Sequence, residues 1–304
     1  MATLLKQLAL VSQSRRVGTD DLLKVSAPLQ KQASRDLAPV WEISATVDAF
    51  AKLEDVPLGY WPLIVMDDIG VDAAGVHEDK DGQPFALISA SDKLDEWSLT
   101  ASHEMLEMLV DPFGNRLVAS DSPKEGQGRV SVLVEVCDPS ESPENAYTAN
   151  GVLVSDFYTP NYLDPVVAAG VRYSYTGAIT EPRQILRGGY LSWVDSTDNH
   201  WWQETWFDGN GPAFRDIGPL DQKAGSLRAQ IDRITEADRA KATSDGRQRA
   251  SAAGLTSAVV QRATGSKAEM WRQQIGALLG QPSTRPQKEK SSQVRPARRV
   301  RPGD

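Results

Sequence analysis

The sequence predicts an α+β fold, in which a mixed sheet with helices is followed by a β-rich segment and C-terminal helices. Strand-length apolar segments and amphipathic helices follow one another in the first 110 residues. Residues 171–207 contain short alternating stretches broken by turn residues, and the chain beyond Gly218 is rich in Ala, Arg, Gln and Glu. With 40% hydrophobic residues and eight Trp, the 304-residue chain can bury the core of one domain of about 200 residues with an extension.

The first strand and helix are predicted near the N-terminus. Residues 4–12 are mostly apolar over a strand length, and Thr19–Leu37 have a helical pattern. Thr19 is suited to be the N-cap because two acidic residues follow it in the first turn. Pro28 is expected to kink or divide this helix, since it cannot donate the usual backbone hydrogen bond.

Strands follow this helix. Residues 43–50 alternate apolar and polar side chains, and residues 61–66 form a short apolar run of the buried-strand type. Residues 74–90 are predicted to form a hairpin, with its turn at 79–82 and a return strand at 84–89.

The next helix, from about Ser98 to Val110, carries the most informative residues of the chain. His103, Glu104 and Glu107 fall on one arc of the helix, while Met, Leu and Val residues fill the rest. One interpretation is an amphipathic helix with a solvated acidic edge. The other is a metal site, because a histidine and a carboxylate four residues apart can bind one ion.

Further carboxylates follow at the ends of predicted strands. The strand at 130–136 leads into Glu135 and Asp138, and the strand in 151–162 leads into Asp156 and Tyr158. Polar groups at the ends of elements are where sites are commonly assembled, so these positions favour the second interpretation.

The β-rich segment contains predicted strands at 189–194 and 200–207. Trp193, Trp201, Trp202 and Trp206 are interpreted as packing residues, and a stacking platform for sugars or bases is the alternative. Helices are predicted at 220–243 and 250–279, where they would dock on the body or mediate oligomerisation.

Residues 98–112 resemble the active-site helix of the zincin metallopeptidase superfamily, with Glu107 in place of the second histidine of H-E-x-x-H. The predicted order of strand, helix, two strands, hairpin and helix is also similar to the N-terminal half of zincins. The segment SHEMLEMLVDP followed by EVCDP resembles uncharacterised bacterial and phage proteins with an H-E-x-x-E signature. The resemblance implies a zincin-like domain over residues 1–215.

The resemblance also implies roles for individual residues. His103 and Glu107 would bind the metal, and Glu104 would be the general base that takes a proton from a metal-activated water. The resemblance further implies a third ligand from Glu135 or Asp138, with Asp111 as a supporting or alternative group. Apart from the resemblance, Asp156 is a second supporting or alternative candidate because of its place at a strand end, and Tyr158 is a candidate for an oxyanion contact from its residue type alone.

The implied cofactor is one divalent metal ion. Zinc is preferred, but a set of one histidine and two carboxylates also suits manganese, iron or calcium. Such an anionic set makes the metal a poorer Lewis acid. His77 is a candidate ligand but is expected to be exposed in the hairpin, and Cys137 is expected to be a buried small apolar residue.

The function predicted from these residues is that of a metallopeptidase-like hydrolase, whose peptide or protein substrate would bind along the 84–89 strand by strand addition. One alternative is a non-catalytic, metal-binding structural or interaction protein, associated with a phage particle or another assembly. A third is nucleic-acid binding through the basic tail.

Charge and composition lead to further expectations about the tail, nucleic-acid binding and localisation. Residues 281–304 carry seven basic and two acidic residues, which leaves 26 basic and 39 acidic residues in the first 280. The tail is therefore expected to be disordered, and the acidic body is not expected to bind nucleic acid. The single Cys137 excludes an intrachain disulfide, and no signal peptide or membrane span is recognised, so a soluble cytoplasmic or phage-associated protein is expected. The predicted divisions are a body at 1–215, a helical extension at 216–280 and the tail at 281–304.

Overall fold

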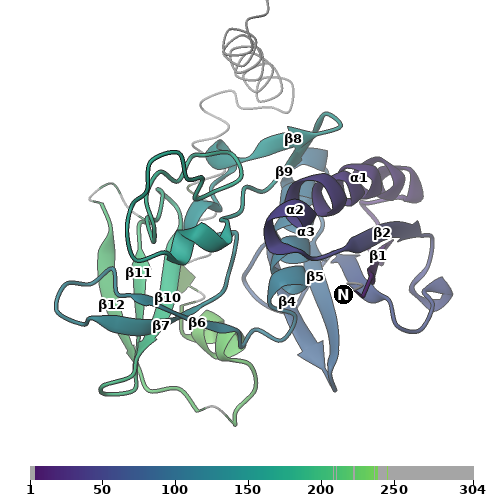
Figure 1. The fold of residues 1–304 in the computed structure, drawn as a ribbon. Coiled ribbons are helices and arrows are strands. Elements are labelled where there is room, and N and C mark those ends of the chain that lie inside the picture. Colours follow the sequence, from purple (N-terminus) through teal and green to yellow (C-terminus); the bar gives the residue numbers. More distant parts are fainter. Residues whose placement is uncertain are drawn as a thin grey trace, which may run out of the picture. The chain divides into compact units, whose positions relative to one another are not determined.

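The described residues of the computed structural model are 4–207, 209, 211–221, 223–235, 237–238 and 245. All of them belong to the first of the chain's two units, residues 1–264. They form a mixed α/β structure with several sheets and few helices (Figure 1). In the described part of the chain, no helix is both long and apolar enough to cross a membrane.

The first sheet contains the five strands of the N-terminal segment. They are β1 (Lys6–Ser12), β2 (Ala45–Phe50), β3 (Trp61–Met66), β4 (Gly75–Lys80) and β5 (Gln83–Ser89). Their order is β2-β1-β3-β5-β4, and every neighbouring pair is parallel except β4 with β5. The strands predicted from the sequence are confirmed to within about two residues at their ends.

The hairpin of β4 and β5 is tighter than predicted. Its loop consists of Asp81 and Gly82, which both have positive φ angles, 54° and 79°, as two-residue hairpin loops require. β5 lies between β3 and β4 and is hydrogen-bonded on both sides. The prediction that a peptide adds to residues 84–89 is therefore wrong, because β4 is the strand at this edge of the sheet.

The first helix is longer and less regular than predicted. It runs through α1 (Thr19–Lys31), a π-helical segment (Gln32–Leu37) and α2 (Ala38–Trp41). Pro28 lies inside α1 without dividing it, and the change of helical pitch comes only after Lys31. Gly18, not Thr19, is the N-cap, so the predicted cap is wrong by one residue.

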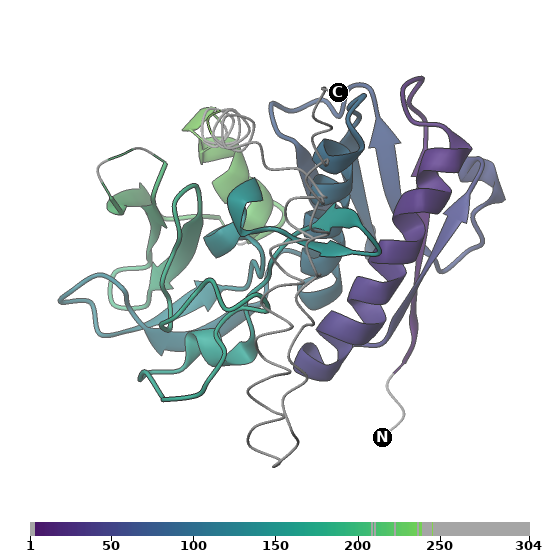
Figure 2. The same ribbon diagram turned by 90° about the horizontal axis from the view of Figure 1, so that it is seen from above.

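The helix with the candidate site residues is α3 (Leu94–Val110), which begins four residues before the predicted Ser98. It packs against β4 and β5, while α1 packs against β1 and β2 (Figure 2). The core between helices and sheet contains fully buried apolar side chains, among them Leu10, Leu63, Ile88 and Met105. The polar arc of α3 is buried as well, with Glu104 and Glu107 3% and 0% exposed, so the interpretation as a solvated acidic edge is wrong.

The second sheet is antiparallel. Its strands are β6 (Leu117–Asp121), β7 (Arg129–Leu133), β10 (Tyr190–Asp195), β11 (His200–Thr205) and β12 (Ala213–Gly218), in the order β12-β11-β10-β7-β6. β6 and β12 were not predicted. Trp193 and Trp201 are buried, which confirms their packing role, and Trp202 and Trp206 are half-buried.

Two predicted strands are shorter in the structure. β7 ends at Leu133, so Glu135 lies in the segment that follows it. Only β9 (Val152–Val154) of the predicted 151–162 strand is extended in a sheet, where it pairs with β8 (Tyr147–Ala149). Short 3₁₀ turns lie between strands in both parts of the chain. They are η2 (Leu53–Asp55), η3 (Asp138–Ser140), η4 (Pro143–Asn145) and η5 (Pro160–Leu163).

The C-terminal helices are described only in part. Residues 227–235 are helical, so the helix predicted at 220–243 begins seven residues later than expected. The helix predicted at 250–279 and the tail at 281–304 lie outside the described residues. The proposed division of the chain at residues 215 and 280 stays a prediction.

Candidate metal centre

α3 and β4 approach each other closely at Gly75. A Cβ atom at this position would lie 2.6 Å from Thr100 Cγ2 and 2.8 Å from Glu104 Oε1. Only glycine can therefore occupy this position without a shift of the helix or strand. The close approach brings His77, two residues further along β4, against the polar arc of α3.

His77 is buried, so the expectation that it is exposed in the hairpin is wrong. Its Nε2 lies 3.0 Å from the carbonyl oxygen of Asp111 and donates a hydrogen bond to it. Its Nδ1 lies 3.6 Å from Glu104 Oε2 and 3.7 Å from Glu107 Oε2. In a neutral ring that donates through Nε2, the Nδ1 lone pair faces these two carboxylates, so a proton or a cation is needed there.

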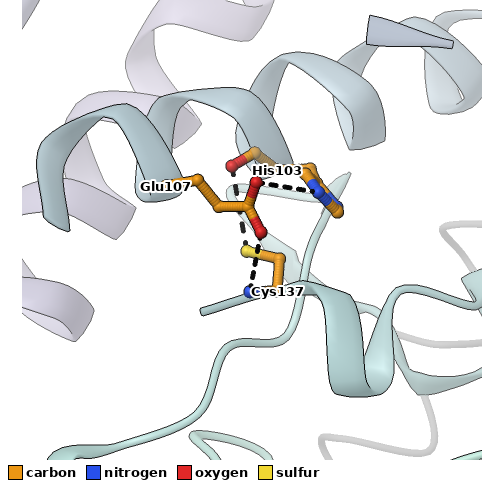
Figure 3. A group of neighbouring side chains, drawn as sticks. All are labelled: His103, Glu107 and Cys137. Atoms are coloured by element: carbon orange, nitrogen blue, oxygen red, sulfur yellow. Dashed lines mark hydrogen bonds and ion pairs between the residues drawn. The ribbon is translucent and has the colours of Figure 1, made fainter. Parts of the chain in front are cut away.

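The segment after β7 completes the cluster from the opposite side. The backbone N–H of Cys137 donates a 3.1 Å hydrogen bond to Glu107 Oε1, and the Cys137 thiol contacts the carbonyl oxygen of His103 (Figure 3). His103 Nε2 lies 3.3 Å from Glu107 Oε2 and 3.2 Å from Asp138 Oδ1. The structure thus brings His103, Glu107 and Asp138 together, as the sequence predicted.

Burial and mutual charge determine how these groups ionise. Burial disfavours the charged form of Glu107, but Arg228, His103 and His77 together hold its pKa well below the usual range. Burial and the neighbouring Glu107 charge raise the pKa of Asp138 well above its ordinary value. Burial also lowers the pKa of His103, but the nearby carboxylates outweigh it and raise that pKa well above 6.5. These shifts arise because His103, Glu107 and Asp138 share one buried position, where each charge acts strongly on the others.

Several buried polar atoms of the cluster make no hydrogen bond among the described residues. They are His77 Nδ1, Glu104 Oε2, Glu135 Oε1, Asp138 Oδ2 and the hydroxyl of Tyr158. Buried polar groups are nearly always hydrogen-bonded, so such a concentration points to a missing ligand. Oxygen and imidazole nitrogen atoms are the donors that divalent cations take in proteins. The residues therefore fit a metal ion.

Three groups of side chains can place ligand atoms within 4.8 Å of one another. They are His103 with Glu107 and Cys137, His77 with Glu107 and Glu135, and His103 with Asp138 and Glu141. The group with Cys137 is the weakest candidate for a metal site. Burial raises the pKa of the Cys137 thiol and so opposes formation of the thiolate that would bind metal. Cys137 is otherwise the buried small residue that the sequence predicted.

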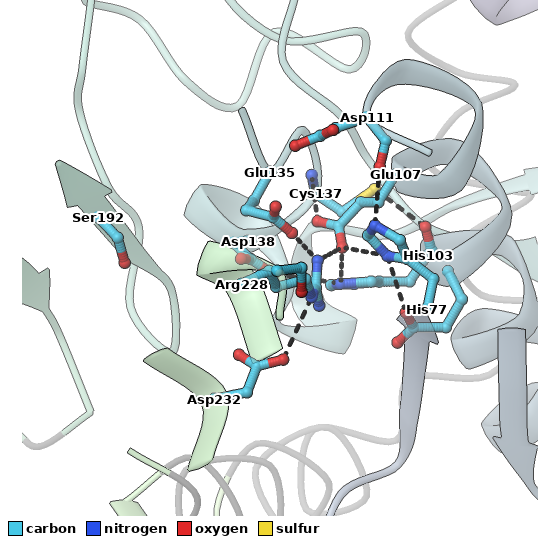
Figure 4. A network of polar contacts seen from close by, with 12 residues as sticks. His77, His103, Glu107, Asp111, Glu135, Cys137, Asp138, Ser192, Arg228 and Asp232 are labelled. Carbon is cyan, nitrogen blue, oxygen red and sulfur yellow. Dashed lines mark hydrogen bonds and ion pairs between the residues drawn. The ribbon is translucent and has the colours of Figure 1, made fainter. Parts of the chain in front are cut away.

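Arg228 is the functional residue that sequence reasoning missed. Its guanidinium Nη1 contacts Oε2 of both Glu107 and Glu135, and its Nε lies 3.2 Å from Asp232 (Figure 4). It comes from the helix at 227–235, more than 100 residues from α3 in sequence, and no local pattern marks it. Its backbone N–H donates to the carbonyl oxygen of Gly114 at 3.0 Å, which fixes the start of this helix beside the end of α3.

The remaining predicted residues lie around the cluster. Asp111 Oδ2 accepts a hydrogen bond from the backbone N–H of Arg116 at 2.7 Å, so this carboxylate holds the turn after α3. Asp156 accepts two hydrogen bonds from Thr176 and is absent from the three ligand groups found among the described residues. Tyr158 is fully buried and stacked on Tyr162. Burial is the main cause that raises the pKa of Tyr158 well above its ordinary value, and Tyr162 and the charges of Glu107 and Asp138 raise it further.

Comparisons with models of protein families, with curated proteins and with solved structures give no match for this chain. Its function is therefore inferred from the geometry of this cluster.

Proposed function

We propose that this protein is a metal-dependent hydrolase of the peptidase type with a zincin-like catalytic domain. The observation that carries the proposal is the convergence of His103 and Glu107 of α3 with Asp138. Glu104 lies beside His103 in the same helix, with its Oε2 atom 3.6 Å from His77 Nδ1. The order of β1, α1, β2, β3, the β4–β5 hairpin and α3 supports the zincin-like assignment, because it is the order that the resemblance implies.

His103, Glu107 and Asp138 would hold the metal, with Glu135 as an alternative third ligand. A bound divalent metal would supply Lewis acidity, which polarises a carbonyl group and acidifies water. Zinc is the preferred ion, and manganese, iron and calcium also suit this carboxylate-rich set. The Cys137 amide fixes Oε1 of Glu107, so Oε2 is the atom that faces the ligand position.

Glu104 is the proposed general base. Its carboxylate is buried beneath β4, where Oε2 makes no hydrogen bond among the described residues and lies 3.6 Å from His77 Nδ1. In this role Oε2 would accept a proton from water and return it to a leaving amine. His77 would orient this carboxylate, and the Tyr158 hydroxyl would donate to the developing oxyanion.

The edge strand β4 is the proposed binding strand for an extended peptide. Among the described residues it pairs only with β5, so no second strand is paired with its other edge. Strand addition there would place a peptide next to His77 and Glu104.

The decisive experiment compares cleavage of a peptide library by wild type and by Glu104→Gln. Loss of cleavage with unchanged metal content is expected, because the amide cannot accept the proton. Glu125→Gln, the same change at an exposed carboxylate, is the matched control. Full cleavage by Glu104→Gln would exclude this mechanism.

A second candidate is a non-catalytic protein with a structural metal ion. It is favoured by the closure of the site, since the side chain of His103 is only 12% exposed while those of Glu107 and Asp138 are at most 2% exposed. Structural metal sites are closed, whereas catalytic sites keep a position open for water. One tightly held metal ion without cleavage of any peptide would support this candidate.

A further inference from the structure

The cluster contains more buried negative charge than one guanidinium can neutralise. Glu104, Glu107, Glu135 and Asp138 are all buried, and Arg228 forms ion pairs with Glu107 and Glu135. Buried carboxylates need cations close by, so the position of each cation decides which carboxylates remain for a metal.

Arg228 already occupies one of the three ligand groups. His77, Glu107 and Glu135 place their donor atoms within 4.8 Å of one another, and Arg228 Nη1 contacts two of the three. A second group is formed by His103, Asp138 and Glu141, in which His103 Nε2 lies 3.2 Å from Asp138 Oδ1. Glu107 Oε2 lies between the two groups, in contact with Arg228 on one side and 3.3 Å from His103 Nε2 on the other.

Arg228 is also held rigidly in this place. Its Nε pairs with Asp232 one turn later in the same helix, and the preceding residue, Leu227, donates from its backbone N–H to Asn115 Oδ1 at 2.8 Å. Leu227 and Ile231 pack with Leu133 and Trp201 in a separate apolar cluster. The helix at 227–235 is thus anchored independently of the ion pairs of Arg228.

We propose that Arg228 is a built-in second cation of this centre: it occupies the His77–Glu107–Glu135 position and confines a single divalent metal to the side of His103 and Asp138. Two metals that share a carboxylate are a common arrangement in hydrolases, and here the guanidinium would take the place of one of them. The inference rests on the metal binding of the proposed function. It also selects Asp138 over Glu135 as the third ligand.

The first test measures metal stoichiometry with Zn²⁺ and Mn²⁺ on the full chain, by elemental analysis after gel filtration. Wild type is expected to hold about one equivalent of metal per chain. Arg228→Met is expected to hold about two, because Glu107 and Glu135 lose their contact with the guanidinium and can bind a second ion together with His77. Arg228→Lys keeps a cation and is expected to hold about one. Adding His77→Ala to Arg228→Met should return the value to about one.

A second pair of variants tests the same inference with Arg228 intact. Glu135→Gln is expected to keep about one equivalent, and Asp138→Asn to lose at least tenfold in metal affinity measured by calorimetric titration. Circular dichroism of each variant verifies folding.

The outcomes separate the two proposals. One equivalent in both wild type and folded Arg228→Met, or loss of the metal in Glu135→Gln but not in Asp138→Asn, would overturn the role of Arg228. No metal in wild type but one equivalent in Arg228→Met would mean that the guanidinium competes for the only metal position, which also overturns it. No metal in any variant would overturn the proposed function itself.

Discussion

The backbone N–H of Cys137 and the Oε1 atom of Glu107 form a 3.1 Å hydrogen bond that joins the segment after β7 to α3. The bond leaves Oε2 of the same carboxylate facing His103, His77 and Arg228. Glu107 is therefore the residue around which the centre is organised, and its orientation depends on a backbone group 30 residues away.

Metal binding should stabilise the folded chain. At a free Zn²⁺ or Mn²⁺ concentration of 100 times Kd, the free energy of unfolding is expected to rise by about 2.7 kcal/mol. Thermal unfolding with and without the ion measures this effect. His103→Ala should abolish it, whereas His200→Ala, which removes a half-exposed histidine of β11, should leave it unchanged. Equal stabilisation of both variants would place the ion elsewhere.

Replacement of Gly75 should loosen the packing of β4 on α3. In Gly75→Ala the new methyl group would meet Thr100 Cγ2 at 2.6 Å and Glu104 at 2.8 Å. Such overpacking typically lowers the free energy of unfolding by about 1–3 kcal/mol, measured by urea denaturation. Gly209→Ala is the control, because nothing lies within 4 Å of its added Cβ. A loss no greater than in the control would show that the strand moves away at little cost.

Tyr147 supports the buried carboxylate of Asp36 in the π-helical segment. Its hydroxyl donates to Asp36 Oδ2 at 2.8 Å, and Tyr175 donates to Oδ1 at 2.7 Å. Because Asp36 is buried, Tyr147→Phe should lower the free energy of unfolding by about 1.5–3 kcal/mol. Tyr60→Phe removes an exposed hydroxyl contact to Asp48 and should change it by less than about 0.5 kcal/mol. Similar losses in both variants would contradict this account.

Glu204 should make stability depend on pH near neutrality. Burial raises the pKa of this carboxyl from 4.5 to about 7, so the folded chain binds its proton more tightly than the unfolded chain does. Stability should therefore fall as pH rises from about 4.5 to 7, and the loss should be complete above pH 7. Relative to wild type, Glu204→Gln should gain stability on the order of 3 kcal/mol across this range. Denaturation curves at pH 4 and pH 8 measure it, and parallel pH profiles for the two proteins would refute the assignment.

The sequence by itself determined the elements of the first sheet and the residues at the centre of the candidate site. Local patterns suffice for these: apolar periodicity marks β3 and α3, and a four-residue spacing places His103 and Glu107 on one helical face whatever surrounds the helix. The short segment after β7 similarly marked Asp138, because it follows a strand end.

Only the tertiary structure decided which other groups reach that face. His77 is expected to be exposed from its place in a hairpin, but the close approach at Gly75 buries it against α3. Arg228 lies in a helix whose composition is that of an ordinary solvent-exposed helix. It reaches the cluster because its neighbours Leu227 and Ile231 pack on the apolar side chains of Leu133 and Trp201. Contacts between distant segments depend on packing and close approach, which the spacing of residues along the chain does not encode.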